Sequence, residues 1–186
     1  NSGDKLTLLS SNILNNDRIS ALALSITGVK LVNNGMITGE KGIFNIDNIE
    51  NYGTLYGKNT LSITGNNLIN NKLIQGSNDL YISSQIIENK DDLFAGNNIS
   101  LIAISLDNIG RIIGDGNLTF NTSNLFTNSN LIQGNNIKIA GIDNSGKIVA
   151  KEGIEAVEIK NSGTISALKS LKSNKLLNLI LGKTIL

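Results

Sequence analysis

The densest group of residues that could perform acid–base chemistry consists of Glu88, Asp91 and Asp92, with Lys90 among them. Two carboxyl groups held close together can act as general acid and general base in the cleavage of a polysaccharide. These carboxylates directly precede Leu93, which belongs to a regular apolar pattern described below. We therefore expect them in a solvated turn and predict a protein that is not an enzyme, with a polysaccharide-active enzyme as the alternative.

The composition excludes several other classes of site. The 186 residues include no His and no Cys, which removes the usual catalytic triads, thiol nucleophiles and zinc sites. The only arginines, Arg18 and Arg111, lie far apart in the sequence. Neither a Gly-Gly-x-Gly-x-Asp calcium repeat nor a Gly-rich phosphate loop occurs. We predict no catalytic residue, no metal site and no cofactor.

The charge balance gives no reason to expect a nucleic acid or a membrane as partner. The 16 basic and 15 acidic residues leave a net charge of +1. No apolar run approaches the roughly 18–20 residues that span a bilayer, and the first residues do not resemble a signal peptide. The C-terminal part is more basic, and we interpret its lysines as solvated charge because they are spread over several repeats: Lys147, Lys151, Lys160, Lys169, Lys172, Lys175 and Lys183.

A seven-residue pattern returns nine times along the chain. It reads Asn, any residue, usually a small or polar residue, any residue, Ile or Leu, any residue, and Gly or Ala. An apolar residue also stands two positions before each Asn, and successive Asn residues are 16 to 20 positions apart. A fixed period of this length indicates a repeat architecture. The Asn residues are Asn15, Asn33, Asn51, Asn70, Asn89, Asn108, Asn128, Asn144 and Asn161.

Each repeat also contains a short alternation of apolar and other residues, such as Leu24-Ser25-Ile26 and Leu61-Ser62-Ile63. A period of two predicts a strand with one buried face. A unit of this length has no room for a helix as well, and it lacks the Leu-x-x-Leu-x-Leu frame of leucine-rich repeats. The pattern therefore predicts an all-β fold, a right-handed parallel β-helix (solenoid) of about nine coils over residues 1–167.

The distance from this alternation to the Asn varies. The second apolar residue lies seven positions before the Asn in five repeats, and five before Asn51, Asn144 and Asn161. In the Phe120 repeat the distance is eight. We interpret this as length variation concentrated in one connecting turn.

We predict a structural role for the nine Asn residues. At a coil corner an Asn side chain can bond its own backbone, and stacked amides one coil apart can form a ladder. The Gly or Ala six residues later suits a crowded second corner. Gly fills the third position of the pattern in five repeats, where we expect left-handed backbone geometry. Asp17, Lys72, Asp91 and Asn130 replace it in the other four, and Asn and Asp also adopt this geometry.

These motifs resemble the repeats of the filamentous haemagglutinin family, large exoproteins of Gram-negative bacteria. The nearest matches begin at Asn33, Asn51, Asn144 and Asn161, each with Gly two residues later. The resemblance implies a shaft segment of an adhesin or contact-dependent inhibition protein, exported by two-partner secretion through an outer-membrane transporter. It implies a location at the bacterial surface and, as partner, a receptor or glycan on a host cell or bacterium. The passenger of a single-chain autotransporter is the other alternative.

The register of the pattern fails after Ala167. Residues 168–186 predict either a partial tenth coil or a C-terminal cap such as a short helix. The coil interpretation places Leu176 in the Asn column, with Ile180 and Gly182 at the following positions.

Overall fold

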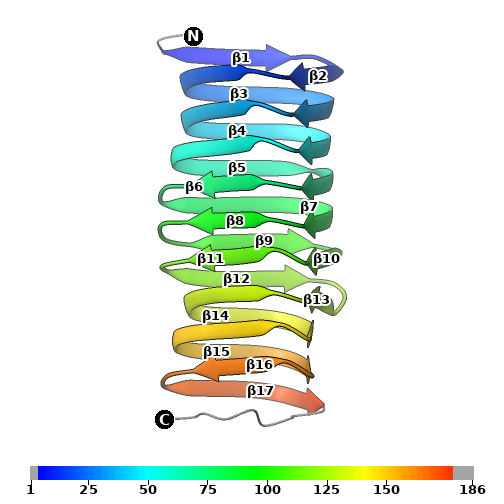
Figure 1. Ribbon diagram of the computed structural model, residues 1–186, viewed down its shortest axis with the longest axis vertical. Coiled ribbons are helices and arrows are strands. Elements are labelled where there is room, and N and C mark those ends of the chain that lie inside the picture. The colour runs from blue at the N-terminus through cyan, green and yellow to red at the C-terminus, as the bar shows by residue number, and fades with distance from the viewer. Residues whose placement is uncertain (1–3, 178–186) are drawn as a thin grey trace.

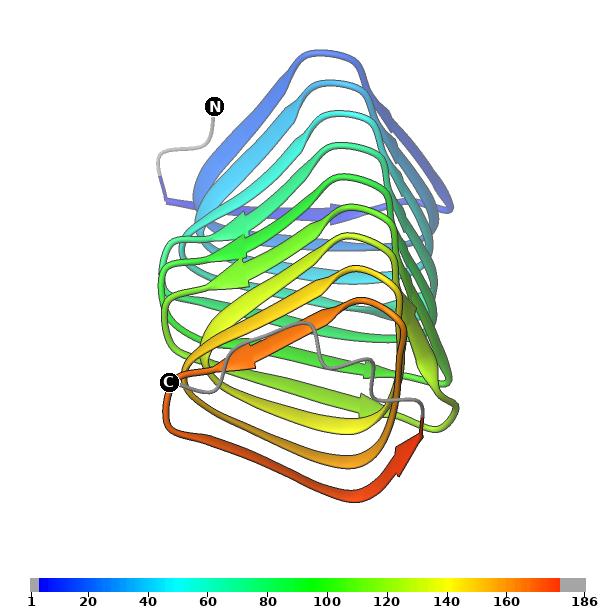
Figure 2. The same ribbon diagram turned by 60° about the horizontal axis from the view of Figure 1, so that its bottom comes forward.

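The computed structural model describes residues 4–177, and in this range the chain is a stack of parallel strands without a helix. The chain winds around one axis, and each turn lies beside the preceding one (Figure 1). A turn has the outline of a rounded triangle, and the winding is right-handed (Figure 2). The fold is therefore the predicted right-handed parallel β-helix of about nine coils.

Seventeen strands form the stack, and the long ones continue around the corners of a coil. They are β1 (Lys5–Leu9), β2 (Asn12–Asn15), β3 (Arg18–Asn33), β4 (Met36–Asn51), β5 (Thr54–Asn70), β6 (Leu73–Gly76), β7 (Asp79–Asn89), β8 (Asp92–Ala95), β9 (Ile99–Ala103), β10 (Ser105–Asn108), β11 (Arg111–Gly114), β12 (Asn117–Thr122), β13 (Phe126–Asn128), β14 (Leu131–Asn144), β15 (Lys147–Asn161), β16 (Thr164–Ala167) and β17 (Ser170–Leu177).

Each coil has three sides, which we call faces 1, 2 and 3 in chain order. Face 1 begins with β1, face 2 with β2, and face 3 with the first residues of β3. Every segment pairs in parallel with the segment one coil later, so that Leu6 lies opposite Leu24 and Ile13 opposite Leu31. All nine Asn residues lie opposite one another in the same way.

Apolar columns fill the interior of the stack. The column two residues before the Asn is buried throughout, from Ile13 to Ile159. The column four residues after it is buried except at its two ends, where Ile19 and Ile165 are partly covered. Face 1 contributes two further columns. Fully burying one such side chain stabilises the fold by about 1.5–3 kcal/mol, so only the shared columns of neighbouring coils hold a coil in place.

The nine Asn side chains form one continuous ladder in the corner between faces 2 and 3. The Nδ2 of each Asn donates a hydrogen bond to the Oδ1 of the Asn in the next coil, over 2.6–2.9 Å. Seven of these residues are 0 % exposed, and the end residues Asn15 and Asn161 are 6 % and 3 % exposed. Buried amides without partners would strongly destabilise the fold, so the ladder fixes the register of every coil.

The same amides also bond the backbone that turns around them. The Nδ2 of Asn70 donates to the carbonyl oxygen of Lys72 over 2.8 Å, and that of Asn89 donates to Asp91 over 2.8 Å. In six coils the Nδ2 further approaches a carbonyl oxygen of the next coil, as from Asn89 to Arg111 over 3.2 Å. Asn therefore supplies both donor and acceptor where the strands are interrupted.

The length of the coils varies mainly at the corner between faces 1 and 2. Six positions separate Phe120 from Phe126, whose rings stack with centroids 5.1 Å apart, and only three separate Ile139 from Ile142.

The predicted position of the second apolar residue, five before the Asn, is wrong for the coil that ends at Asn51. There Phe44 lies opposite Ile26 and Ile63 at the usual position. Ile46, which stands five positions before Asn51, lies opposite Gly28 and not in the second apolar column. Gly42 occupies the first apolar position, where a Cβ atom would lie 2.8 Å from Cδ1 of Leu61.

Two expectations about small residues have different outcomes. The prediction of a left-handed backbone at the third pattern position is wrong for the five glycines there, because none of them has a φ in that region. Instead, a Cβ atom on Gly53 would lie 1.9 Å from the carbonyl oxygen of Gly35 in the preceding coil. The second corner is crowded, as predicted: a Cβ atom on Gly76 would lie 2.2 Å from the carbonyl oxygen of Asp79, in the same coil.

Strand β17 continues faces 1 and 2 below β15, so residues 170–177 form part of a tenth coil. The predicted alignment is wrong by two residues. Leu176 lies opposite Ile159, in the apolar column, and not in the Asn column. Ile180 and Gly182 lie outside the described residues.

The ladder makes a testable prediction. The double substitution Asn70→Ala and Asn89→Ala removes two adjacent rungs and leaves buried amide groups of Asn51 and Asn108 without their partners. At about 1–3 kcal/mol for each unsatisfied buried group, the melting temperature followed by circular dichroism should fall on the order of 10 °C. Asn45→Ala, at an exposed position on face 1, is the control and should leave it unchanged. Equal melting curves for both variants would contradict the role of the ladder.

Candidate binding groove on face 1

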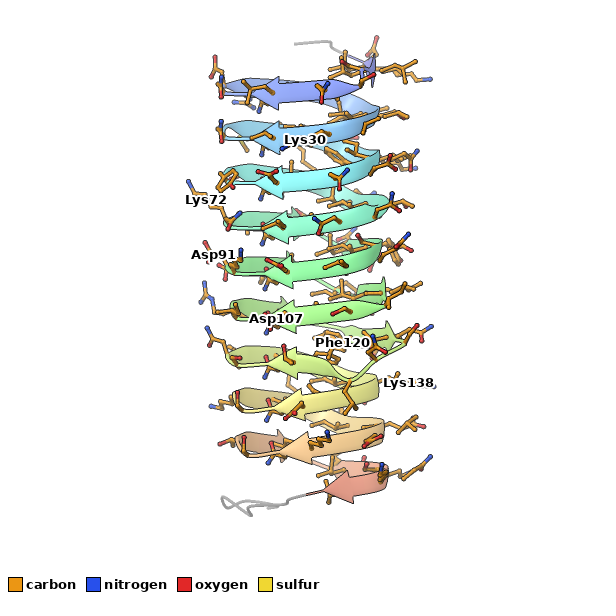
Figure 3. The ribbon with its side chains drawn as sticks, turned by 90° about the vertical axis from the view of Figure 1, so that its right-hand side faces the viewer. Lys30, Lys72, Asp91, Asp107, Phe120 and Lys138 are labelled. Carbon is orange, nitrogen blue, oxygen red and sulfur yellow. The ribbon has the colours of Figure 1, made fainter. Side chains whose placement is uncertain are left out.

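The acidic cluster considered from the sequence does not form a paired-carboxylate site. Glu88 pairs with Lys90 over 3.1 Å, and Asp92 forms a two-point ion pair with Arg111 of the next coil, over 2.6 and 2.7 Å. Asp91 lies in the corner turn between them, where Figure 3 shows it at one edge of the shaft, above Asp107 and below Lys72. Two of the three carboxylates are thus held by cations.

Arg18 and Arg111 stand in different coils of face 3 and are not brought together. In the described range, residues 4–177, no group of three or more acidic, His or Cys side chains could hold a metal ion.

The pKa values of two outer side chains, Glu50 and Tyr81, differ from their ordinary values. Lys30 contacts Glu50 over 2.7 Å, and its hydrogen bond, reinforced by its charge, keeps the pKa of Glu50 below the ordinary 4.5. On face 1, burial raises the pKa of Tyr81, and the negative charge of Asp79 adds to this effect.

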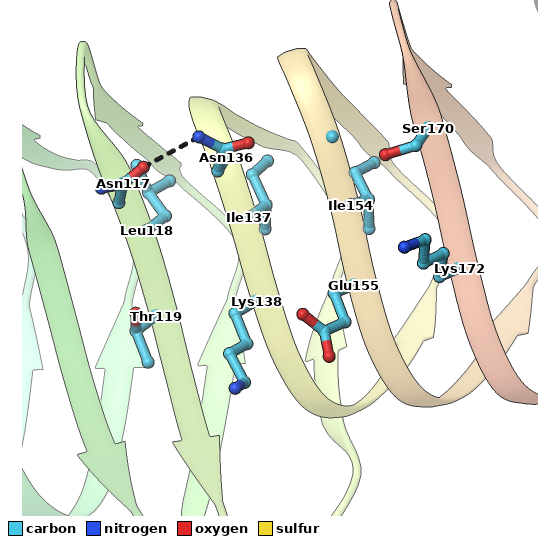
Figure 4. A pocket seen from close by; sticks show the side chains of 11 residues that line it. Asn117, Leu118, Thr119, Asn136, Ile137, Lys138, Ile154, Glu155, Ser170 and Lys172 are labelled. Atoms are coloured by element: carbon cyan, nitrogen blue, oxygen red, sulfur yellow. Dashed lines mark hydrogen bonds between the residues drawn. The ribbon is translucent and has the colours of Figure 1, made fainter.

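A groove of about 420 Å³ lies on face 1 over β12, β14, β15 and β17 (Figure 4). Two outward rows of residues line it, because side chains two positions apart on a strand point to the same side. The upper row in Figure 4 runs Asn117, Asn136, Gly153, Ser170, and the lower row runs Thr119, Lys138, Glu155, Lys172.

The upper row is polar except at Gly153, which has no side chain. The Nδ2 of Asn136 donates to the Oδ1 of Asn117 over 3.1 Å, so the amide oxygen of Asn136 points away from Asn117, toward Gly153. The hydroxyl of Ser170 points toward Gly153 from the other side (Figure 4). A Cβ atom on Gly153 would lie 2.7 Å from this hydroxyl oxygen and 3.8 Å from the Asn136 oxygen. Gly153 therefore leaves a gap of one side chain in the row.

The lower row carries two lysines on either side of one glutamate. Three other lysines of these coils form ion pairs: Lys151 with Asp115 over 3.4 Å, Lys169 with Glu152 over 2.5 Å, and Lys175 with Glu158 over 3.0 Å. Within the part of the chain that the structure describes, Lys138 and Lys172 have no such partner. The described C-terminal lysines are exposed, as expected for solvated charge, except for the half-buried Lys160. Lys183 lies outside the described residues.

Comparisons of the chain with models of known protein families, with curated proteins and with solved structures found no match. Between residues 4 and 177, no helix is long and apolar enough to cross a membrane.

The Lys30–Glu50 contact gives a second prediction. Replacing Lys30 by Met should return the pKa of Glu50 to about its ordinary value of 4.5, as measured by NMR titration of the carboxyl carbon. Because the folded-state pKa is lowered, the pair stabilises the fold above that value, and the contribution is lost as the pH falls through the lowered pKa. Lys41→Met, an exposed lysine on face 1, is the control. An unchanged Glu50 titration in Lys30→Met would refute the assignment.

Proposed function

We propose that this chain is a shaft segment of a large secreted bacterial surface protein, a rigid rod that mediates adhesion or presents a distal binding or toxin domain. The observation that supports it is the continuous stack: the Asn ladder and the apolar columns run from Asn15 to Asn161, and strands pair in parallel on all three faces of these coils. Parallel pairing on three sides of each coil resists bending, and a rod of constant cross-section holds its ends at a fixed distance.

The setting of this rod is part of the proposal and is supported by the haemagglutinin-like motifs. The motif places an Asn, then Gly, then Ile or Leu, then Gly or Ala at the positions of that family's repeats. The Asn forms the ladder, and the two small residues stand where a side chain would contact a backbone carbonyl. We infer export by a two-partner system through an outer-membrane transporter, and a receptor or glycan on another cell as the partner. The passenger of an autotransporter could have the same stacked coils. The flanking gene sequence distinguishes export by a two-partner system from export as an autotransporter.

A shaft should tolerate the loss of one whole coil. Deleting residues 71–89 joins Asn70 to the next coil and lets Asn70 stack on Asn108 in the usual register. We expect a folded variant with a single cooperative melting transition and a rod shorter by about 4.8 Å in small-angle X-ray scattering. Deleting residues 71–80 removes about half a coil, breaks the register and should prevent folding. A whole-coil deletion that unfolds like the half-coil deletion would refute the shaft.

Adhesion is tested with beads that carry the purified chain at high density. These beads should bind to epithelial or bacterial cells more than beads that carry the same chain after heat denaturation. Equal binding of both bead types would overturn the adhesive part of the proposal. A parallel incubation with acidic polysaccharides tests the enzymatic alternative, and product formation that Asp91→Asn abolishes would replace the proposal with an enzyme.

A further inference from the structure

The groove on face 1 contains a gap of one side chain. Asn136, Gly153 and Ser170 stand opposite one another in three successive coils, so the Cα atoms of Asn136 and Ser170 lie two strand spacings apart, about 9.5 Å. Gly153 leaves the space between their side chains empty (Figure 4). A Cβ atom at Gly153 would lie 2.7 Å from the Ser170 oxygen and 3.8 Å from the Asn136 oxygen, so these two oxygens are at most about 6.5 Å apart. At hydrogen-bond distances of about 2.7–3.2 Å, the gap has room for one hydroxyl group of a sugar.

Hydrogen-bonding groups face this gap from both sides. The amide nitrogen of Asn136 is already used by Asn117, which fixes the orientation of the amide and leaves its oxygen as an acceptor toward Gly153. The Ser170 hydroxyl can donate or accept. An acceptor on one side and a hydroxyl on the other can bond the same sugar hydroxyl group, which donates to Asn136 and exchanges a hydrogen bond with Ser170.

Positive charge lies along the same groove. Lys138 and Lys172 stand two residues further along the strands that carry Asn136 and Ser170, on the same side of the sheet. Glu155 lies between them in the register, and it forms no ion pair with either within the described residues. The row therefore carries a net charge of +1 and two ammonium groups without a carboxylate partner.

We propose that this groove binds a sugar unit that carries a carboxylate, as in a uronic acid. One of its hydroxyl groups enters the gap at Gly153 and bonds Asn136 and Ser170, and its carboxylate lies on the side of the groove that carries the ammonium groups of Lys138 and Lys172. Glu155 weakens the binding through repulsion. The inference rests on the proposed adhesive function, for which it names the chemical class of the receptor.

The test uses the purified chain and two probes, one with carboxylates and one in which each carboxylate is a neutral methyl ester. Trigalacturonate should bind in an NMR titration or in isothermal calorimetry, and its affinity should fall as the salt concentration rises. The fully methyl-esterified trimer keeps every hydroxyl group but has no carboxylate, and should bind several-fold more weakly. Absence of trigalacturonate binding, or equal affinity for the ester, overturns the inference.

Variants locate the site. Lys138→Ala and Lys172→Ala should each weaken trigalacturonate binding by about threefold, and Glu155→Gln should strengthen it by a similar factor. Lys147→Ala removes the same charge from face 3 of the same stack and is the matched control, with no expected effect. Charge variants that behave like Lys147→Ala would overturn the site.

Gly153→Ala fills the gap, and its closest contact is the rotatable Ser170 hydroxyl, so the variant should fold with an unchanged melting curve. It should lose most of the binding, and full binding by a folded Gly153→Ala chain would contradict the role of the gap.

The bead assay separates this inference from the proposed function. Beads with Gly153→Ala that adhere to cells as well as the unmodified chain would refute the groove as the adhesive site and leave the shaft and its adhesion standing. Trigalacturonate binding at the groove without any adhesion of beads would support the site and refute the adhesive function.

Discussion

The buried Asn ladder is the constraint on which the rest of the molecule depends. A primary amide enclosed in protein needs partners for two donors and one acceptor, and here the preceding and following coils supply part of them. Each coil must therefore return its Asn to the same line. The positions near the Asn therefore repeat in the same way in each coil: an apolar residue two positions before the Asn, another four after it, and a small residue six after it. Differences in length fall at the other two corners, mainly between faces 1 and 2, with a one-residue register shift between faces 3 and 1 in two places.

The outer surface is free of this constraint and carries the chemistry that differs from coil to coil. Outward rows on face 1 contain Ser, Thr, Asn, Lys and Glu in no fixed order, although the strands beneath them are nearly identical. The groove lies where Gly153 interrupts such a row. Its positive charge comes from two lysines, Lys138 and Lys172, that form no ion pair within the described residues. A regular scaffold thus allows a site to be built from small local exceptions.

Most of the fold could be predicted because the ladder and the core are periodic, and periodicity is visible in a single sequence. The errors occur where one residue compensates for another. Phe44 fills the room left by Gly42, which made the apolar pair of that coil appear two residues late. Leu176 was placed in the wrong column because its coil had no recognised Asn to set the register.

The candidate site was not predictable in the same way. Whether a lysine has a carboxylate in reach depends on which residues the register places one coil away and on which way each side chain turns. Lys169 and Lys172 look alike in the sequence, yet Lys169 contacts Glu152 over 2.5 Å and Lys172 stands beside an unpaired Glu155.

The ladder also has a direction. Every one of its eight bonds runs from a nitrogen in one coil to an oxygen in the following coil, so the amide dipoles add along the axis instead of cancelling. A partly assembled rod consequently offers N–H groups at its growing C-terminal tip and a carbonyl at its base. Folding can therefore extend like a zipper in the order in which the polypeptide is delivered, with each finished turn acting as the template for the next.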